Sequence, residues 1–107
     1  MLKFAVVLYK QPEMSQEDFR HYFRNVHAPL AKKIPGLRKC VHNYAAPDPT
    51  RKPPEWHGIA ELYFDDFESM QTAWATAEGE EATDDLKYFT DLARTTWSVV
   101  EEVAVLT

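Results

Sequence analysis

FRHYFRNVHAPLAKKIPG, residues 19–36, is the segment that determines how this chain of 107 residues folds. Its apolar side chains recur at helical spacing, so one face of an amphipathic helix can lie against a sheet. His27 lies at the edge of this face, and Pro29 lacks an amide hydrogen and crowds the carbonyl of Asn25. We therefore expect the helix to bend or restart beside His27. The apolar residues are Phe19, Tyr22, Phe23, Val26, Leu30 and Ile34.

The flanking residues predict where this helix begins and ends. Ser15 and Asp18 resemble a capping box, which places the start of the helix at Ser15 or Gln16. The Pro-Gly pair at 35–36 stops the helix and permits a turn.

Four other segments have the composition of β-strands: residues 2–9, 37–46, 57–64 and 97–106. The first is apolar at nearly every position, which indicates a strand covered on both faces. Alternation places His42 and Tyr44 on one face of the second strand. In the same way, His57 and Tyr63 share one face of the third strand.

Two helices are predicted between the third and fourth strands. Asp65 or Asp66 caps the first, Gly79 interrupts the pattern, and a further helix runs from about Glu80 to Arg94. The order of elements is that of a doubled βαβ unit. It predicts an α+β, ferredoxin-like fold in which a four-stranded antiparallel sheet carries helices on one face.

The second face of this sheet has no helices to cover it. Because its residues include apolar and aromatic side chains, we expect it to pack against a second copy of the chain, as a homodimer with a barrel-like interior. Glu101 and Glu102 are neighbours on the last strand and point to opposite faces. One of them should therefore meet whatever covers the sheet.

The composition excludes several classes of function. The chain has 12 Lys and Arg against 17 Asp and Glu, a net charge of −5, which argues against nucleic acid as the main partner. No apolar run approaches the roughly 20 residues that span a bilayer, so no membrane partner is expected. Cys40 is the only cysteine, which rules out an intrachain disulfide and fits a cytoplasmic location. We expect one domain over residues 1–107.

The segments FRNVHAPL at 23–30 and IPGLRK at 34–39 resemble the EthD family, within the dimeric α+β barrel superfamily. GIAELYFD at 58–65, VVEE at 99–102 and the order of elements also agree, so the resemblance covers nearly the whole chain. It implies a homodimer whose sheets face each other, with a pocket between sheet and helices in each subunit. It also implies a small protein that works without a cofactor. The wider superfamily includes isomerases, cyclases, decarboxylases, cofactor-free monooxygenases and haem-degrading enzymes, so the fold does not select a reaction.

His27 is the candidate catalytic residue. An imidazole can take a proton from an activated carbon or a phenol and return it, a step shared by isomerisation, cyclisation and decarboxylation. The alternative is a structural histidine that hydrogen-bonds the carbonyl freed by Pro29. His21, on the same helix, is expected to be solvated.

A second group of residues is predicted to bind a small hydrophobic or aromatic metabolite. If their strand faces line the interior, they surround an aromatic-walled cavity that suits a flat, oxygenated ligand. The alternative places the histidines at a surface or interface, the aromatic residues in the core, and Asp65 at a helix cap. The inward member of the Glu101–Glu102 pair would either orient a histidine or form a salt bridge with Arg38 or Lys39 at the edge of the dimer. The candidates are Tyr9, His42, Tyr44, His57, Tyr63, Asp65 and Trp97, with Phe4 as a further wall.

Three functions fit these features. The first is a cofactor-independent enzyme that uses His27 as acid or base on an aromatic or lactone-like metabolite. The second is a non-catalytic protein that binds such a metabolite. The third is haem handling, with His27 or His42 as axial ligand. The histidines lack the spacing of known metal sites, so no metal is expected.

Overall fold

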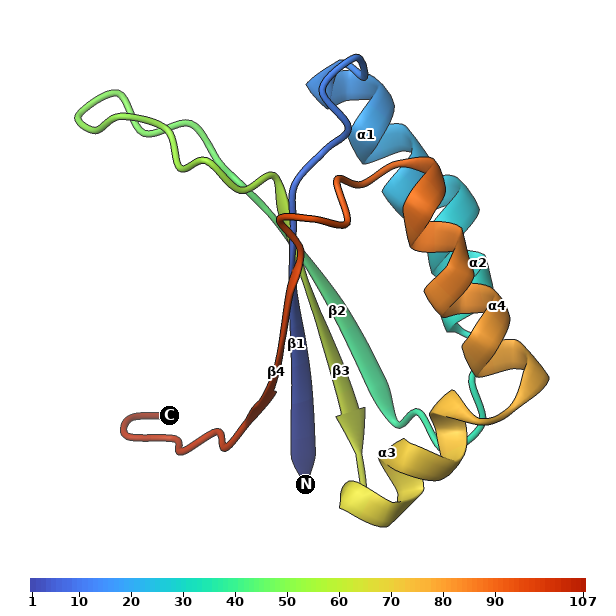
Figure 1. Cartoon of the computed structure of the whole chain (residues 1–107). Helices are drawn as coiled ribbons and strands as arrows, with labels where there is room; N and C mark the ends of the chain where they lie inside the picture. Colours follow the sequence, from blue (N-terminus) through green and yellow to red (C-terminus); the bar gives the residue numbers. More distant parts are fainter.

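The chain folds as one antiparallel sheet with two lines of helices against one of its faces (Figure 1). In this computed structural model, all residues from 1 to 107 are described. Each pair of neighbouring strands is antiparallel, so the sheet has the predicted ferredoxin-like arrangement. The strands are β1 (Leu2–Leu8), β2 (Lys39–Tyr44), β3 (Gly58–Phe64) and β4 (Thr96–Val100), in the order β2-β3-β1-β4.

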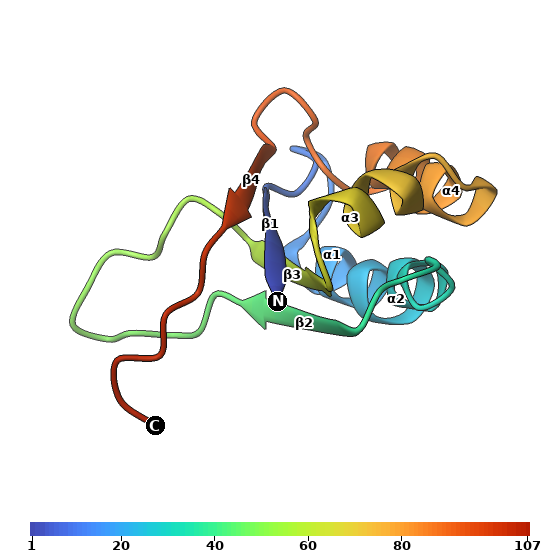
Figure 2. The same ribbon diagram turned by 90° about the horizontal axis from the view of Figure 1, so that it is seen from below.

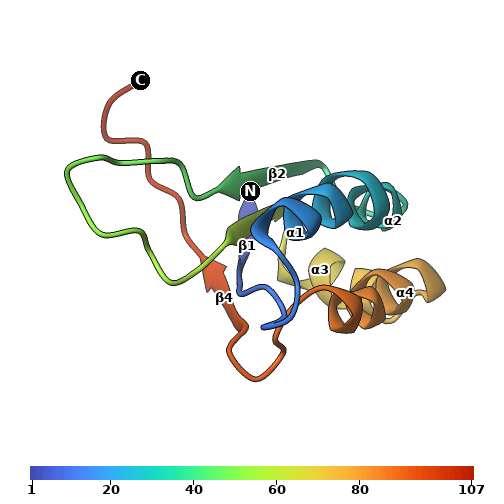
Figure 3. The same cartoon turned by 90° about the horizontal axis from the view of Figure 1, so that it is seen from above.

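The helices run over the sheet as two lines. The first line consists of α1 (Gln16–Tyr22), the π-helical turn η1 (Phe23–His27) and α2 (Ala28–Ala31). The second consists of α3 (Phe67–Trp74), α4 (Ala77–Asp85) and the 3-10 turn η2 (Leu86–Tyr88). Both lines lie on the same side of the sheet, and no helix covers the other side (Figure 2 and Figure 3).

The core lies between the sheet and the helices. On β3 every second residue from Gly58 to Phe64 is buried, which is the period-two pattern of a strand with one covered face. Phe19 and Phe23 of the first helical line are fully buried above it. A Cβ at Gly58 would lie 3.1 Å from the Phe23 ring, so the missing side chain allows the helix to approach β3 closely.

The first helical line restarts beside His27, as Pro29 predicts. The amide of Ala28 donates to the carbonyl of Phe23, five residues back, which makes a π-helical turn. The next helix, α2, begins at Ala28 and has Pro29 in its first turn, where a missing amide hydrogen costs little. Phe23 and His27, at the two ends of the turn, are both buried.

Several predicted boundaries are wrong. The strand β4 ends at Val100, so Glu101 and Glu102 lie beyond it and do not alternate across the sheet. Of the two predicted caps for α3, Asp66 is the one that forms, by accepting a hydrogen bond from the amide of Ser69. Because the pairing ladders end before the predicted termini, β1 and β3 are each one residue shorter than expected, and β2 is two residues shorter at each end.

Gly79 does not interrupt a helix but lies inside α4, which Thr76 caps. A Cβ at this position would collide with the carbonyl oxygen of Ala73, so the glycine allows α4 to start directly after α3. The helical region ends at Tyr88 rather than at about Arg94. The segment after it turns back to the end of β1, where Asp91 donates its amide hydrogen to the Tyr9 carbonyl.

The face of the sheet without helices combines a charge cluster with apolar side chains. Lys3 lies 2.7 Å from Glu61 and 2.6 Å from Glu102. The Tyr63 hydroxyl donates to Glu102 at 2.9 Å. Lys3 therefore pairs with two carboxylates of its own chain. Half-buried apolar residues lie on the same face: Ala5, Val7, Val41 and Ile59.

Candidate functional site

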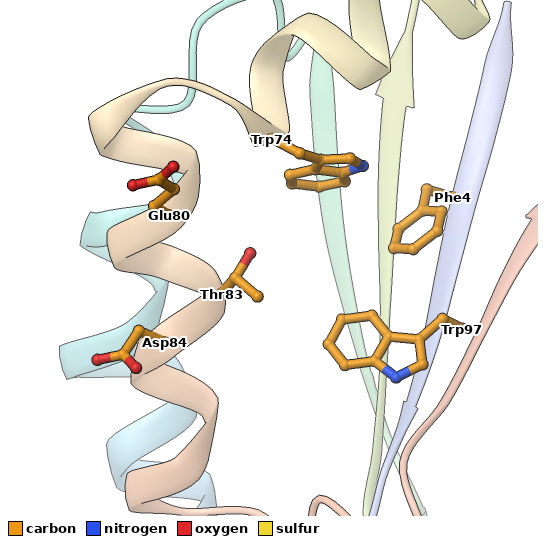
Figure 4. Close-up of a pocket in the computed structure, with 6 residues that line it drawn as sticks. All are labelled: Phe4, Trp74, Glu80, Thr83, Asp84 and Trp97. Atoms are coloured by element: carbon orange, nitrogen blue, oxygen red, sulfur yellow. The ribbon is translucent and has the colours of Figure 1, made fainter.

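A pocket opens between α4 and the side of the sheet formed by β1 and β4 (Figure 4). Its volume is about 710 Å³. Three aromatic rings from three elements form one wall, and the ring of Phe4 lies 5.4 Å from that of Trp74 and 6.1 Å from that of Trp97. Thr83 of α4 faces these rings across the pocket (Figure 4). The outer pocket is thus an aromatic slot open to solvent.

The pocket narrows toward the core and reaches His27. The inner part has a volume of about 40 Å³, little more than one water molecule occupies in the liquid. It shares four lining residues with the outer part, so the two are continuous. His27 and Thr83 are the polar residues of an otherwise apolar lining.

A buried carboxylate holds the His27 ring. Nδ1 of His27 lies 2.9 Å from Oδ2 of Asp85, and the Tyr22 hydroxyl donates to Oδ1 of the same carboxylate at 2.7 Å. The side chains of His27 and Asp85 are each only 10% exposed. Tyr22 and His27 belong to the first helical line and Asp85 ends α4, so the three residues join the two lines.

Burial and hydrogen bonding together determine where the protons lie. Burial lowers the pKa of His27 below its usual value, and the neighbouring Asp85 offsets only part of this shift, so the ring is neutral at pH 7. Burial, followed by the hydrogen bond to Asp85, raises the pKa of Tyr22 to about 12, and its hydroxyl stays protonated. Because both Asp85 oxygens accept hydrogen bonds, the neutral His27 ring carries its proton on Nδ1. Nε2 is left as an acceptor.

The His27 ring forms its hydrogen bond within the protein through Nδ1, to Asp85. Nε2 makes no hydrogen bond within the protein. The one fully buried side-chain polar atom without a partner is Nε of Arg20, so Nε2 is not sealed in the core. It is reached from the inner pocket that His27 lines. The alternative in which His27 satisfies the carbonyl freed by Pro29 is therefore wrong.

Most of the predicted substrate-binding residues do not share this pocket. Trp97 lines it. His42 and Tyr44 face the helices from β2, but they line neither part of the pocket, and the ring of Phe23 stacks on His42 at 3.7 Å. Tyr63 lies on the opposite face of the sheet, in the cluster around Lys3. The two strand faces expected to form one cavity are thus different faces.

The remaining candidates lie outside the pocket as well. His57 precedes β3, so it does not share a strand face with Tyr63 as predicted, and its Nδ1 accepts from the Lys10 amide. The ring of Tyr9 lies 6.5 Å from that of His57. Asp65 forms an exposed ion pair with Arg38 at 2.9 Å. These contacts of His57, Tyr9 and Asp65 all lie within the protein, and none of them requires a ligand.

The two glutamates near the end of the chain do not orient a histidine. Glu102 lies against Lys3 on the face without helices, because the chain crosses to that side after Val100. Within one chain Arg38 is bonded to Asp65 rather than to either glutamate, so the salt bridge predicted for the dimer edge stays a prediction.

Functional roles were not predicted for Asp85 and the Tyr22 hydroxyl, which hold His27, or for Trp74 and Thr83, which line the pocket. Asp85 is an acid on the buried side of a helix, between Ala82 and Phe89 at helical spacing. This spacing is a signal that the sequence carries, because an acidic residue on an apolar face requires a buried partner. The identity of that partner, 58 residues away, is not visible in the sequence.

No three His, Cys, Asp or Glu side chains gather in an arrangement that would hold a metal ion. No helix has both the length and the apolar composition needed to cross a membrane.

The chain belongs to the EthD family: the family model, described as the EthD domain, matches residues 11–93. An ethyl tert-butyl ether d (EthD) family protein from Bacillus halodurans is 37% identical, with a TM-score of 0.78 over 96% of this chain and all of that one. No curated protein matches this chain.

More distant structures share the fold alone. A dimeric protein of unknown function with a ferredoxin-like fold, from Bacteroides fragilis, is 15% identical, with a TM-score of 0.68 over 94% of this chain and 95% of that one. SnoaB, a cofactor-independent oxygenase from Streptomyces nogalater, is 10% identical, with a TM-score of 0.65 over 98% of this chain and 95% of that one. These comparisons confirm the family and the ferredoxin-like fold.

His42→Phe should make the stability of the fold less dependent on pH. Burial, and then the nearby His27, lower the pKa of His42 from 6.5 to about 4. The unfolded chain therefore binds the additional proton as the pH falls below 6.5, and stability that is complete above this pH is lost toward pH 4. For one such group the loss between pH 7 and pH 5 is about 2 kcal/mol.

Denaturant unfolding at these two pH values measures the difference. The loss of stability on acidification should be about 2 kcal/mol smaller in His42→Phe than in the wild type. His21→Phe, at an exposed position, should lose as much as the wild type. An unchanged loss in His42→Phe would contradict the assignment.

Proposed function

We propose that this chain is a small cofactor-independent enzyme that uses His27 to transfer a proton on an aromatic or lactone-like metabolite. The observation that carries the proposal is the His27 ring, buried, neutral and bonded through Nδ1 to Asp85, with Nε2 open to an aromatic-walled pocket. A base of this kind needs both an unprotonated nitrogen and access to a ligand. His27 has both.

The chemistry that the site supports is a proton transfer without a net change in oxidation state. Nε2 would take a proton from an acidic C–H or O–H group of the substrate, and the ring would become an imidazolium. The Asp85 carboxylate, at 2.9 Å, would stabilise the new charge while Tyr22 holds its second oxygen. Return of the proton to a different atom of the substrate gives isomerisation. If the carbanion first attacks a carbonyl carbon of the same molecule, return of the proton to the new alkoxide completes a cyclisation.

A second candidate is a protein that binds a hydrophobic metabolite without converting it. The observation in its favour is the lining of the inner pocket, which is apolar except for His27 and Thr83. Haem handling is not favoured, because an inner pocket of about 40 Å³ does not admit a macrocycle to His27. His42 is stacked against Phe23 and lies outside the pocket.

We also propose that the chain forms a homodimer through the face of the sheet that carries no helices. The apolar part of that face is only half buried within one chain. Beyond it, Val103, Val105 and Leu106 of the terminal segment are 69%, 93% and 93% exposed. Covering this surface removes apolar area from water, at about 25 cal/mol per Å². The dimeric ferredoxin-like protein of Bacteroides fragilis has the same fold.

Ile59→Glu should disrupt this dimer, because it places a charge at the centre of the proposed contact. Sedimentation of the wild type should give twice the monomer mass, and the variant should sediment as a folded monomer. Ser69→Glu, on the helical side, is the matched control and should remain a dimer. A monomeric wild type, or a variant that still forms dimers, would contradict the proposal.

His27→Phe should remove proton transfer while preserving the apolar packing of the ring. A suitable probe is 2-acetylnaphthalene, an uncharged bicyclic ketone whose acidic methyl hydrogens lie on a substituent small enough to extend toward His27. In D₂O the wild type should accelerate exchange of these hydrogens, followed by proton NMR. His27→Phe should be slower by at least about 100-fold, the size of a typical general-base contribution.

His21→Phe is the matched control, because this histidine lies on the same helical line but is exposed. It should retain the wild-type exchange rate. Equal rates in the wild type and in His27→Phe would rule out His27 as the base. Binding of the probe without any exchange would favour the second candidate.

A further inference from the structure

We propose that the pocket selects a neutral, planar ligand that offers a hydroxyl group to His27, a phenol or an enol, and discriminates against the corresponding carboxylate. The inference rests on the proposed function for the identity of the site. It adds the class of ligand that the site can hold.

The direction of the hydrogen bond at His27 favours a ligand with a hydroxyl group. Asp85 holds the proton of the neutral ring on Nδ1, so Nε2 can only accept. A hydroxyl group has a hydrogen to donate to it. A ketone oxygen or a carboxylate has none, and either would place its lone pairs against those of Nε2.

The shape of the pocket favours a flat ring system with one small substituent. The inner part holds about 40 Å³, enough for one small substituent but not for a ring. The outer part holds about 710 Å³ between Phe4, Trp74 and Trp97. A bound ligand would therefore keep its ring system among the aromatic side chains and extend one substituent inward. Flat aromatic ligands gain most from such walls, through offset or edge-on ring contacts.

The charges around the pocket disfavour an anionic ligand. No Lys or Arg lines the outer or the inner pocket, so a buried carboxylate would lose its hydration without gaining a cationic partner. The charged lining residues are Glu80 and Asp84, whose carboxylates point away from the rings and form an acidic rim (Figure 4). Lys87 lies beside this rim, but its ammonium group is bonded to Asp84 at 3.0 Å. An anionic ligand thus meets desolvation within and repulsion outside.

Three bicyclic probes with the same ring system separate the effect of the hydroxyl group from that of charge: 2-naphthol, naphthalene and 2-naphthoate. Binding can be followed at pH 7.5 through the indole N–H signals of the protein in ¹H–¹⁵N NMR. Trp74 and Trp97 should shift on titration, whereas Trp56, which lies outside this pocket, is the internal control. The wild type should bind 2-naphthol about tenfold more tightly than naphthalene, as one added hydrogen bond allows. 2-Naphthoate should bind at least about tenfold more weakly than 2-naphthol.

Two variants test the two causes separately. His27→Phe removes the acceptor, so 2-naphthol and naphthalene should bind with equal affinity. Thr83→Lys places a cation opposite the rings on an exposed helix position, so the affinity for 2-naphthoate should rise about tenfold. Since Thr83 is exposed, this variant keeps the inference testable even if His27→Phe fails to fold.

The inference is overturned if 2-naphthoate binds as tightly as 2-naphthol, if naphthalene and 2-naphthol bind equally to the wild type, or if none of the probes shifts Trp74 or Trp97. These outcomes concern binding, whereas the proposed function is tested by exchange. Exchange with a preference for the carboxylate would overturn only the ligand class. Selective binding of 2-naphthol without exchange would support the ligand class and contradict only the catalytic role.

Discussion

The buried carboxylate of Asp85 is the constraint on which the rest of the site depends. A carboxylate that is 10% exposed must be paired or hydrogen bonded, and here His27 and Tyr22 satisfy its two oxygens. Removing one partner from a buried pair of this kind typically costs about 3–5 kcal/mol. The contact therefore ties α4 to the first helical line, and at the same time it fixes the proton on His27 Nδ1. Packing and chemistry share one interaction.

The π-helical turn supplies the other half of this geometry. Pro29 cannot take part in the hydrogen-bond ladder of a continuous helix, and the chain accommodates it by bonding Ala28 to Phe23. The turn ends at His27, on the buried side. From His27 the narrow inner pocket leads into the outer pocket, which is open to solvent and has aromatic rings from β1, α3 and β4 as its wall. The other face of the sheet carries the ion pairs of Lys3 with Glu61 and Glu102, and none of its residues lines the pocket.

The local elements were predictable from the sequence, but the site was only partly so. The helix break at Pro29 and the period-two burial of β3 follow from rules that act over a few residues. The pairing of His27 with Asp85 joins residues 58 positions apart, and no local pattern specifies it. Tyr63 was assigned to the cavity because strand alternation groups residues by face without saying which face the helices cover. Gly79 shows the same limit, since its role depends on the approach of the Ala73 carbonyl.

The central claim is that His27 is neutral and protonated on Nδ1, with Nε2 free to accept a proton from a ligand. Long-range ¹H–¹⁵N NMR correlation of the imidazole rings at pH 7 tests it directly, with His27→Phe identifying the signals. The account predicts that the His27 spectrum shows a protonated Nδ1 and an unprotonated Nε2. A proton on Nε2, or a doubly protonated ring at this pH, would contradict it.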